Sequence, residues 1–305
     1  MTTPVDPAIA AVAAAAAAAP PLTSLTPEQA RARVAAGNSS CANGPDLRSV
    51  RDIRLPVADG QIGARVYTPH AAPRATFVYL HGGGWVTGDL DYSDELCRFL
   101  ADRLAWTVVS VDYRLAPEHP FPTPVNDAYA AVQHVAATIA ANGPLGVGGD
   151  SAGGNLAAAC TLRARDEHGP HLDFQVLLYP VTDHDFTRAS YQTHATAFPI
   201  GVAEMRWFWD HYLPDPERRD LPLASPLRAE LAGLPPAHIV VAGHDPLRDE
   251  GVAYAERLRA AGVKASLAEY PSLTHGFFRL TGVVPAARAA VDDLIDALQL
   301  LTEDH

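Results

Sequence analysis

The sequence predicts an α/β protein with a mostly parallel sheet and helices on both faces. Short apolar segments alternate with helical stretches along most of the chain, and glycine-rich turns directly follow two of these segments. About half of the 305 residues are apolar, which is enough to bury one large core. We therefore expect one α/β domain that needs no second catalytic domain.

Eight segments rich in β-branched and aliphatic residues are the expected strands of this sheet. They are Arg51–Val57, Ala64–Tyr67, Thr76–Leu80, Thr107–Val111, Leu145–Gly149, Phe174–Tyr179, Ala237–Gly243 and Ala265–Tyr270. The last of them should lie at an edge of the sheet. Between Pro180 and about Pro235 the alternation of strands and helices fails, which predicts an insertion.

The expected strand that ends at Gly149 runs into Gly149-Asp150-Ser151-Ala152-Gly153, a GxSxG pattern. Small residues two before and two after a serine allow a tight turn from strand to helix that exposes the serine hydroxyl. A helix is expected from Gly154 to about His168, so strand, turn and helix occur in the required order. Ser151 is therefore the candidate nucleophile, and the amide of Ala152 would point toward the oxyanion.

A second glycine-rich turn, His81-Gly82-Gly83-Gly84-Trp85, follows the expected strand Thr76–Leu80. Such a run is often only a flexible turn. A loop that brings bare backbone amides to a substrate oxygen needs the same composition, and the presence of Ser151 favours this interpretation. Gly82, Gly83 and Gly84 are thus candidate oxyanion-hole residues, while His81 is expected to brace the loop by hydrogen bonding.

A serine hydroxyl needs a base, and that base needs an orienting carboxylate. His275 is the best candidate base, because it lies in a loop after the last expected strand. Asp245 is the first acid after the strand Ala237–Gly243. Its competitors, Asp249 and Glu250, fall where the next helix should begin, and acids there usually interact with the helix dipole.

These motifs resemble those of the bacterial hormone-sensitive lipase family of carboxylesterases (family IV), which has the α/β-hydrolase fold. The chain order serine, aspartate, histidine is also that of α/β-hydrolases. The matching segments span nearly the whole chain and are His81–Trp85, Asp112–Pro122, Gly149–Gly154, Asp245–Gly251 and His275–Phe277. The resemblance implies a serine carboxylesterase that hydrolyses short- to medium-chain esters through an acyl-enzyme.

The resemblance places Ser151 as nucleophile, His275 as base and acid, and Asp245 as its partner. Gly83, Gly84 and Ala152 are the implied amide donors, and Gly82 stays open. Asp150 marks the subgroup that has aspartate before the nucleophile. Candidates for the substrate pocket are Trp85, Asp150, Phe198, Trp207 and Phe277. The aromatic residues of the insertion could equally well pack the cap against its domain.

The resemblance also implies a helical cap. Residues 1–45 look like the family's N-terminal cap segment and residues from about 181 to 234 like its cap insertion, within a catalytic domain of residues 46–305. The alanine-rich run Ala8–Ala19 is too short and too weakly apolar to span a bilayer, and Asp6 rather than Lys or Arg precedes it. We therefore expect a cap helix, no stable membrane association and, by default, a cytoplasmic protein.

Other classes of function remain open. Amidases, deacetylases and lactonases can use the same triad, and no residue excludes them. A different class is a small-ligand receptor, as in the plant gibberellin receptors, which resemble the same family but lack the catalytic histidine. The intact Ser151, Asp245 and His275 favour an enzyme.

Composition excludes several partners. Three widely spaced cysteines (Cys41, Cys97 and Cys160) do not predict a disulfide scaffold, and no residue cluster has metal-ligand spacing, so we expect neither metal nor organic cofactor. A net charge of −12 disfavours nucleic acid and favours neutral or weakly polar esters. The edge strand and the helix expected over Ala286–Leu301 could form a homodimer surface, although a solvated edge with Lys264 and Glu269 would have the same pattern.

Overall fold

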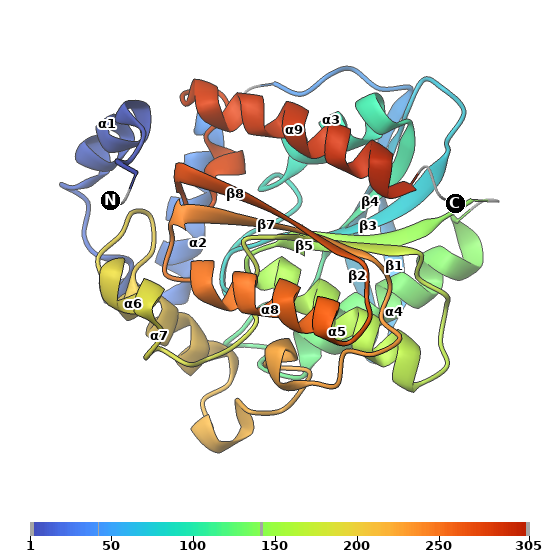
Figure 1. Cartoon of the computed structure of the whole chain (residues 1–305). Helices are drawn as coiled ribbons and strands as arrows, with labels where there is room; N and C mark the ends of the chain where they lie inside the picture. Colours follow the sequence, from blue (N-terminus) through green and yellow to red (C-terminus); the bar gives the residue numbers. More distant parts are fainter. Residues whose placement is uncertain (1–2, 42, 141–142, 303–305) are drawn as a thin grey trace.

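In the computed structural model, which describes residues 3–41, 43–140 and 143–302, eight strands form one sheet in the order β1-β2-β4-β3-β5-β6-β7-β8 (Figure 1). The pairs β1–β2 and β2–β4 are antiparallel and all other neighbours are parallel. The strands are β1 (Ser49–Val57), β2 (Gly60–Thr68), β3 (Ala75–Leu80), β4 (Trp106–Asp112), β5 (Leu145–Asp150), β6 (Phe174–Leu178), β7 (Ala237–His244) and β8 (Ala265–Thr274). The predicted eight-stranded, mostly parallel sheet is thus confirmed, with β8 at an edge.

Helices cover both faces of the sheet, as predicted (Figure 1). The helices of the described residues are α1 (Pro7–Ala16), α2 (Pro27–Ala36), α3 (Asp94–Leu104), α4 (Thr123–Thr138), α5 (Ala152–Asp166), α6 (Ala189–Thr193), α7 (Val202–Tyr212), α8 (Arg248–Ala260) and α9 (Pro285–Thr302). Helices α3 and α9 share one buried apolar cluster with one face of the sheet. Helices α4, α5 and α8 share the cluster on the other face. This three-layer packing buries β3, β5 and β6 completely.

Four helices, α1, α2, α6 and α7, gather at the end of the sheet where β7 and β8 finish (Figure 1). Helices α6 and α7 belong to the long connection between β6 and β7, where the sequence predicts an insertion. Helix α1 has one fully buried residue, Ile9, and its chain is joined to the body by the Asp6 amide, which donates to Ser272 O (2.9 Å). These helices therefore lie over the carboxyl ends of the parallel strands, where α/β proteins place their ligands.

Helix α2 is fixed to the body mainly through Arg31. Its guanidinium pairs with Glu118, and it also donates to Val86 O (2.8 Å) and Ala116 O (2.9 Å). Val86 directly follows the glycine-rich turn, and Ala116 N donates to Trp85 O of that turn (2.9 Å), so α2 is held next to the turn. None of the helices in the described ranges combines the length and the apolar character needed to cross a membrane.

Candidate active site

Ser151 is the single residue between the end of β5 and the start of α5. Its backbone is in a strained conformation with φ 54° and ψ −117°. The backbone of this turn passes very close to β3. A Cβ on Gly149 would lie 2.1 Å from Leu80 O, and a Cβ on Gly153 would lie 1.9 Å from the same oxygen. Only glycine fits at both positions, and the turn has the form of a nucleophile elbow.

His275 hydrogen bonds to both of its predicted partners. Its Nε2 lies 2.9 Å from Ser151 Oγ and its Nδ1 lies 2.7 Å from Asp245 Oδ2. Asp245 is fully buried and its Oδ1 also accepts a hydrogen bond from Leu247 N (2.8 Å). With the Nδ1 proton donated to Asp245, the Nε2 lone pair faces the serine hydroxyl, which is the arrangement a general base requires.

The three side chains come from different parts of the chain: the ends of β5, β7 and β8. In the sheet β6 separates β5 from β7, and β7 pairs with β8. Because these strands are parallel, their carboxyl ends meet at one edge of the sheet, and the loops that follow them converge there.

The two acids that competed with Asp245 have other partners. Glu250 is fully buried and accepts from Thr182 N (2.7 Å) and Asp183 N (3.3 Å), and burial raises its pKa well above the usual range. Asp249 accepts from Ser190 N (2.8 Å). Both acids sit in the first turn of α8, as expected, but they hold the start of the β6–β7 connection rather than merely facing the helix dipole.

The glycine-rich turn offers two amides rather than three. Gly82 N donates to Asp150 Oδ1 (2.8 Å), so this amide is not available to a substrate. Among the described residues, Gly83 N, Gly84 N and Ala152 N have no hydrogen-bond acceptor. We refer to these three groups as the candidate oxyanion amides.

His81 braces the turn, as the sequence predicts. Its Nδ1 donates to Gly82 O (2.8 Å), and its ring stacks on Tyr113 at a centroid distance of 4.3 Å. The Tyr113 hydroxyl in turn donates to His81 O (2.7 Å). His81 is fully buried, and burial lowers its pKa, so it remains neutral and outside the proton-transfer chain.

Asp150 lies behind the turn rather than in a substrate pocket. Besides Gly82 N, it accepts from the Tyr79 hydroxyl (2.8 Å), and it is 2% exposed. Burial raises its pKa. Its hydrogen bond to Gly82 N therefore fixes the position of the glycine-rich turn relative to the nucleophile elbow.

A cavity of about 560 Å³ opens onto Ser151 and His275. Gly83 and Gly84 line it as well, so two of the candidate oxyanion amides belong to residues of its wall. The remaining wall comes from α1, α2, α7, the segment before α7 and the turn after His275, with Val12, Ala13, Ala16, Leu22, Arg33, Phe198, Ile200, Glu204, Met205, Phe208, Arg279 and Leu280 among its residues. We refer to it as the Ser151 cavity.

Of the five predicted pocket residues, only Phe198 lines this cavity. Asp150 lies behind the glycine-rich turn, as described above. Trp85 is fully buried and stacks on Tyr212 (centroids 4.0 Å apart), so it joins the turn to α7. Trp207 is not part of the cavity wall and packs on His211, with ring centroids 4.2 Å apart.

Phe277, the last of the five, is fully buried against Tyr179 and Phe278. The sequence interpretation missed Met205 and Phe208 of α7, which line the cavity in place of Trp207. Helical spacing within Met205–Tyr212 was the available signal, because it separates the residues of α7 into faces.

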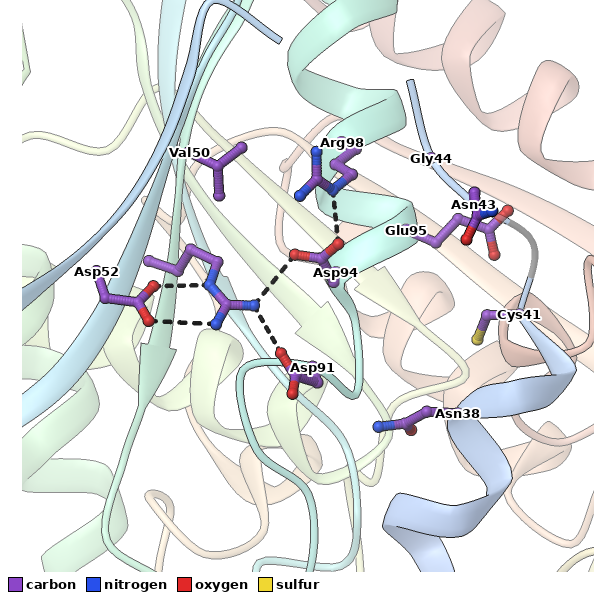
Figure 2. Close-up of a pocket in the computed structure, with 11 residues that line it drawn as sticks. Asn38, Cys41, Asn43, Gly44, Val50, Asp52, Asp91, Asp94, Glu95 and Arg98 are labelled. Carbon is purple, nitrogen blue, oxygen red and sulfur yellow. Dashed lines mark hydrogen bonds and ion pairs between the residues drawn. The ribbon is translucent and has the colours of Figure 1, made fainter. Parts of the chain in front are cut away.

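A second hollow, of about 730 Å³, is polar and shares no lining residue with the Ser151 cavity (Figure 2). Arg65 there pairs with Asp52 (2.7 Å), Asp91 (2.7 Å) and Asp94 (3.2 Å), and Arg98 pairs with Asp94 (2.6 Å). Its wall has four acids, Asp52, Asp91, Asp94 and Glu95, against these two arginines, so it is acidic overall. Across the part of the chain that the structure describes, no three His, Cys, Asp or Glu side chains are grouped to hold a metal ion.

The family model described as alpha/beta hydrolase fold matches residues 77–279, from β3 to the turn after His275. This chain belongs to the α/β-hydrolase fold family, and the predicted resemblance to the hormone-sensitive lipase group is confirmed. Carboxylesterase NlhH of Mycobacterium tuberculosis is 41% identical over 284 residues, which cover 89% of this chain and 88% of the relative.

Two further relatives are similar over nearly their full length. Ethyl acetate hydrolase of Pseudomonas putida is 36% identical, with 92% of each chain covered. The solved structure of a hyperthermophilic esterase from the archaeon Pyrobaculum calidifontis has a TM-score of 0.92 at 37% identity, covering 98% of this chain and 99% of that one.

Proposed function

We propose that this chain is a serine carboxylesterase that hydrolyses short- to medium-chain esters through an acyl-enzyme. The observation that carries the proposal is the buried chain of hydrogen bonds from Ser151 through His275 to Asp245, beside amides that have no acceptor among the described residues. The names of the relatives, which include carboxylesterase, esterase and ethyl acetate hydrolase, support the same reaction class.

The first half of the reaction forms the acyl-enzyme. His275 Nε2 takes the proton of Ser151 Oγ as this oxygen attacks the ester carbonyl, and Asp245 stabilises the imidazolium. The carbonyl oxygen becomes negative and is bound by the candidate oxyanion amides. The bond to the alcohol oxygen then breaks, and His275 gives its proton to the leaving alcohol.

The second half repeats these steps with water. His275 takes a proton from a water molecule, which attacks the acyl carbonyl, and then returns the proton to Ser151 Oγ as the acid leaves. Every proton passes through His275 Nε2. No metal or organic cofactor takes part in the proposed reaction.

The cap assignment also remains a proposal. We infer that residues 1–45 and about 181–234 cover the catalytic domain of residues 46–305, because α1, α2 and α7 each contribute to the wall of the Ser151 cavity. A cavity of about 560 Å³ between these helices and the elbow favours short and medium acyl chains.

The decisive test is hydrolysis of p-nitrophenyl esters from acetate to palmitate by the wild type, Ser151→Ala and Ser110→Ala. Ser110 is a buried serine of β4 and serves as a matched control. We expect activity on the shorter esters that is lost in Ser151→Ala and kept in Ser110→Ala. A folded wild type without ester activity would contradict the proposal and direct attention to amides, lactones and then a receptor role.

A homodimer and a cytoplasmic location stay predictions. The edge position of β8 supports dimerisation through β8 and α9. Glu269 of β8 pairs with Arg248 of α8 (2.7 Å), so part of the charge at this edge is already neutralised within the chain. Light scattering on the purified protein tests the dimer, and a monomer mass at micromolar concentration would contradict it.

A further inference from the structure

Two arginines, Arg33 of α2 and Arg279 of the turn after His275, line the Ser151 cavity. Arg33 donates through Nη1 to Pro20 O. Arg279 donates through Nη2 to Asn38 Oδ1 (2.6 Å) and to Val34 O (3.2 Å), the carbonyl of the residue next to Arg33. Both cations therefore belong to the same side of the cavity, at the second half of α2.

Neither arginine forms an ion pair with a carboxylate in the described part of the chain. Other arginines do, since Arg31 pairs with Glu118 and Arg65 pairs with three aspartates. The chain has 35 acidic and only 23 basic residues, so carboxylates are abundant. Some other arginines of the described residues, such as Arg54 and Arg206, also lack an ion pair, so what distinguishes Arg33 and Arg279 is their place in the wall of the Ser151 cavity.

Arg279 has a further unsatisfied group. Its Nε is buried and has no hydrogen-bond partner among the described residues, while its guanidinium lies 3.8 Å from the ring centroid of Tyr92, another residue of the cavity wall. The charge of Arg279 also acts on the buried Asp150, although the two side chains form no ion pair. Arg279 therefore lines the cavity without a carboxylate in direct contact among the described residues.

The third charged side chain of the wall is Glu204 of α7. Its Oε2 accepts from Gly201 N (2.9 Å) at the start of that helix, where the helix dipole partly compensates a negative charge. The two arginines, Arg33 and Arg279, and the single acid, Glu204, give the wall a net positive charge. This local charge is opposite in sign to that of the whole protein.

We propose that the Ser151 cavity accepts esters that carry a free carboxylate, and that this carboxylate binds to Arg33 and Arg279. This inference rests on the proposed function and names its substrate class. Guanidinium groups bind carboxylates through paired N–H···O bonds. A substrate with one negative charge is compatible with the net negative charge of the protein, because the wall that binds it is positive. The carboxylate is recognised and does not react.

The carboxylate can belong to either part of the ester, and two isosteric pairs of substrates distinguish the cases. Monoethyl succinate against ethyl isocaproate places the charge on the acid part. Acetoxyacetate against isobutyl acetate places it on the alcohol part. The readout is the ratio of kcat/KM for the charged ester to kcat/KM for its neutral partner, which cancels general damage to the enzyme.

We expect one of these ratios to fall about tenfold in Arg33→Gln and in Arg279→Gln, because a charge-assisted hydrogen bond is lost. Arg279→Lys should retain part of the preference, and added salt should lower the ratio of the wild type. Glu204→Gln, which keeps an oxygen for Gly201 N, should raise the ratio. The control is Arg103→Gln, which removes a surface ion pair with Asp292 (2.9 Å) outside the cavity.

The alternative is that both arginines only attach α2 to the body. Both ratios would then stay within twofold of the wild type in the two glutamine variants, and the proposal would be wrong. If Arg279→Gln does not fold, Arg33→Gln decides alone. A wild type that hydrolyses the neutral esters but neither charged ester overturns this inference and leaves the proposed function intact, whereas one that hydrolyses none overturns both.

Discussion

Gly84 gives the sharpest test of the candidate oxyanion amides. It has a φ of +60°, and a Cβ at this position would lie 2.1 Å from Phe208 Cδ1 and 2.2 Å from Phe208 Cγ. In Gly84→Ala the left-handed backbone costs about 1–2 kcal/mol, and the overlap with the Phe208 ring costs about 1–3 kcal/mol. Phe208 lines the Ser151 cavity, but the overlap includes Cγ at the base of its ring, so rotation of the ring relieves it only in part and the glycine-rich turn is expected to shift as well.

A shift of the turn moves Gly83 N and Gly84 N away from the oxyanion. Loss of one such donor lowers turnover by roughly a hundredfold or more, which corresponds to about 3 kcal/mol of transition-state stabilisation. The assay is kcat on p-nitrophenyl butyrate together with the thermal midpoint. The double variant Gly84→Ala/Phe208→Ala removes the overlap and should recover part of the lost turnover relative to Phe208→Ala.

Gly262 provides the matched control. Its φ is +80°, and no heavy atom lies within 4 Å of a Cβ placed there. Gly262→Ala should therefore show the backbone cost in the thermal midpoint and leave kcat unchanged. If Gly84→Ala keeps a kcat within threefold of the wild type, the two loop amides do not bind the oxyanion as we infer.

Three further predictions follow from buried or paired charges. Asp150→Ala leaves Gly82 N and the buried Tyr79 hydroxyl without an acceptor. This change should lower the free energy of unfolding by about 3 kcal/mol and also lower kcat. Asp150→Asn keeps the Oδ1 acceptor and should retain most of the stability and most of the turnover. Burial lowers the pKa of His238 to about 4, so the unfolded chain binds the extra proton below about pH 6.5. Stability should thus fall by about 2 kcal/mol between pH 8 and pH 5, measured by urea unfolding, and His238→Asn should lack that loss. The ion pair with Arg31 lowers the pKa of Glu118 to about 2; Arg31→Gln should return this pKa toward its ordinary value in an NMR titration and raise KM by loosening α2, and an unchanged titration would contradict the pairing.

The sheet could be predicted from the sequence because its strands are short apolar runs between clear turn residues. The two largest differences are at β2, which begins at Gly60 rather than Ala64, and at β8, which continues through Pro271 to Thr274. A proline normally ends a strand, because it has no N–H to donate to a neighbouring strand. At the edge of a sheet one side of the strand has no neighbour, so no hydrogen bond of the sheet is lost. The position of a strand in the sheet, rather than its own residues, determines this boundary.

The residues of the triad could be placed because each follows a predictable strand, and parallel strands bring their carboxyl ends together. The pocket could not be predicted in the same way. Trp207 and Phe208 are neighbours on α7, about 100° apart around the helix, and only the docking of α7 decides which one faces the cavity. Trp85 stacks on Tyr212 and is covered by α7, a long-range contact without a local sequence signal.

The edge position of β8 bears on how activity is lost. His275 directly follows β8, which pairs with only one strand, β7, and whose end has one further backbone hydrogen bond, from Asp6 N to Ser272 O, whereas Ser151 follows β5 in the middle of the sheet. The end of an edge strand can detach at a lower free energy than the core strands. Heat or mild denaturant should therefore displace the histidine while the serine is still held in its elbow. Inactivation would then precede global unfolding and reverse on cooling, so the half-life of activity would report on one strand end rather than on the whole molecule.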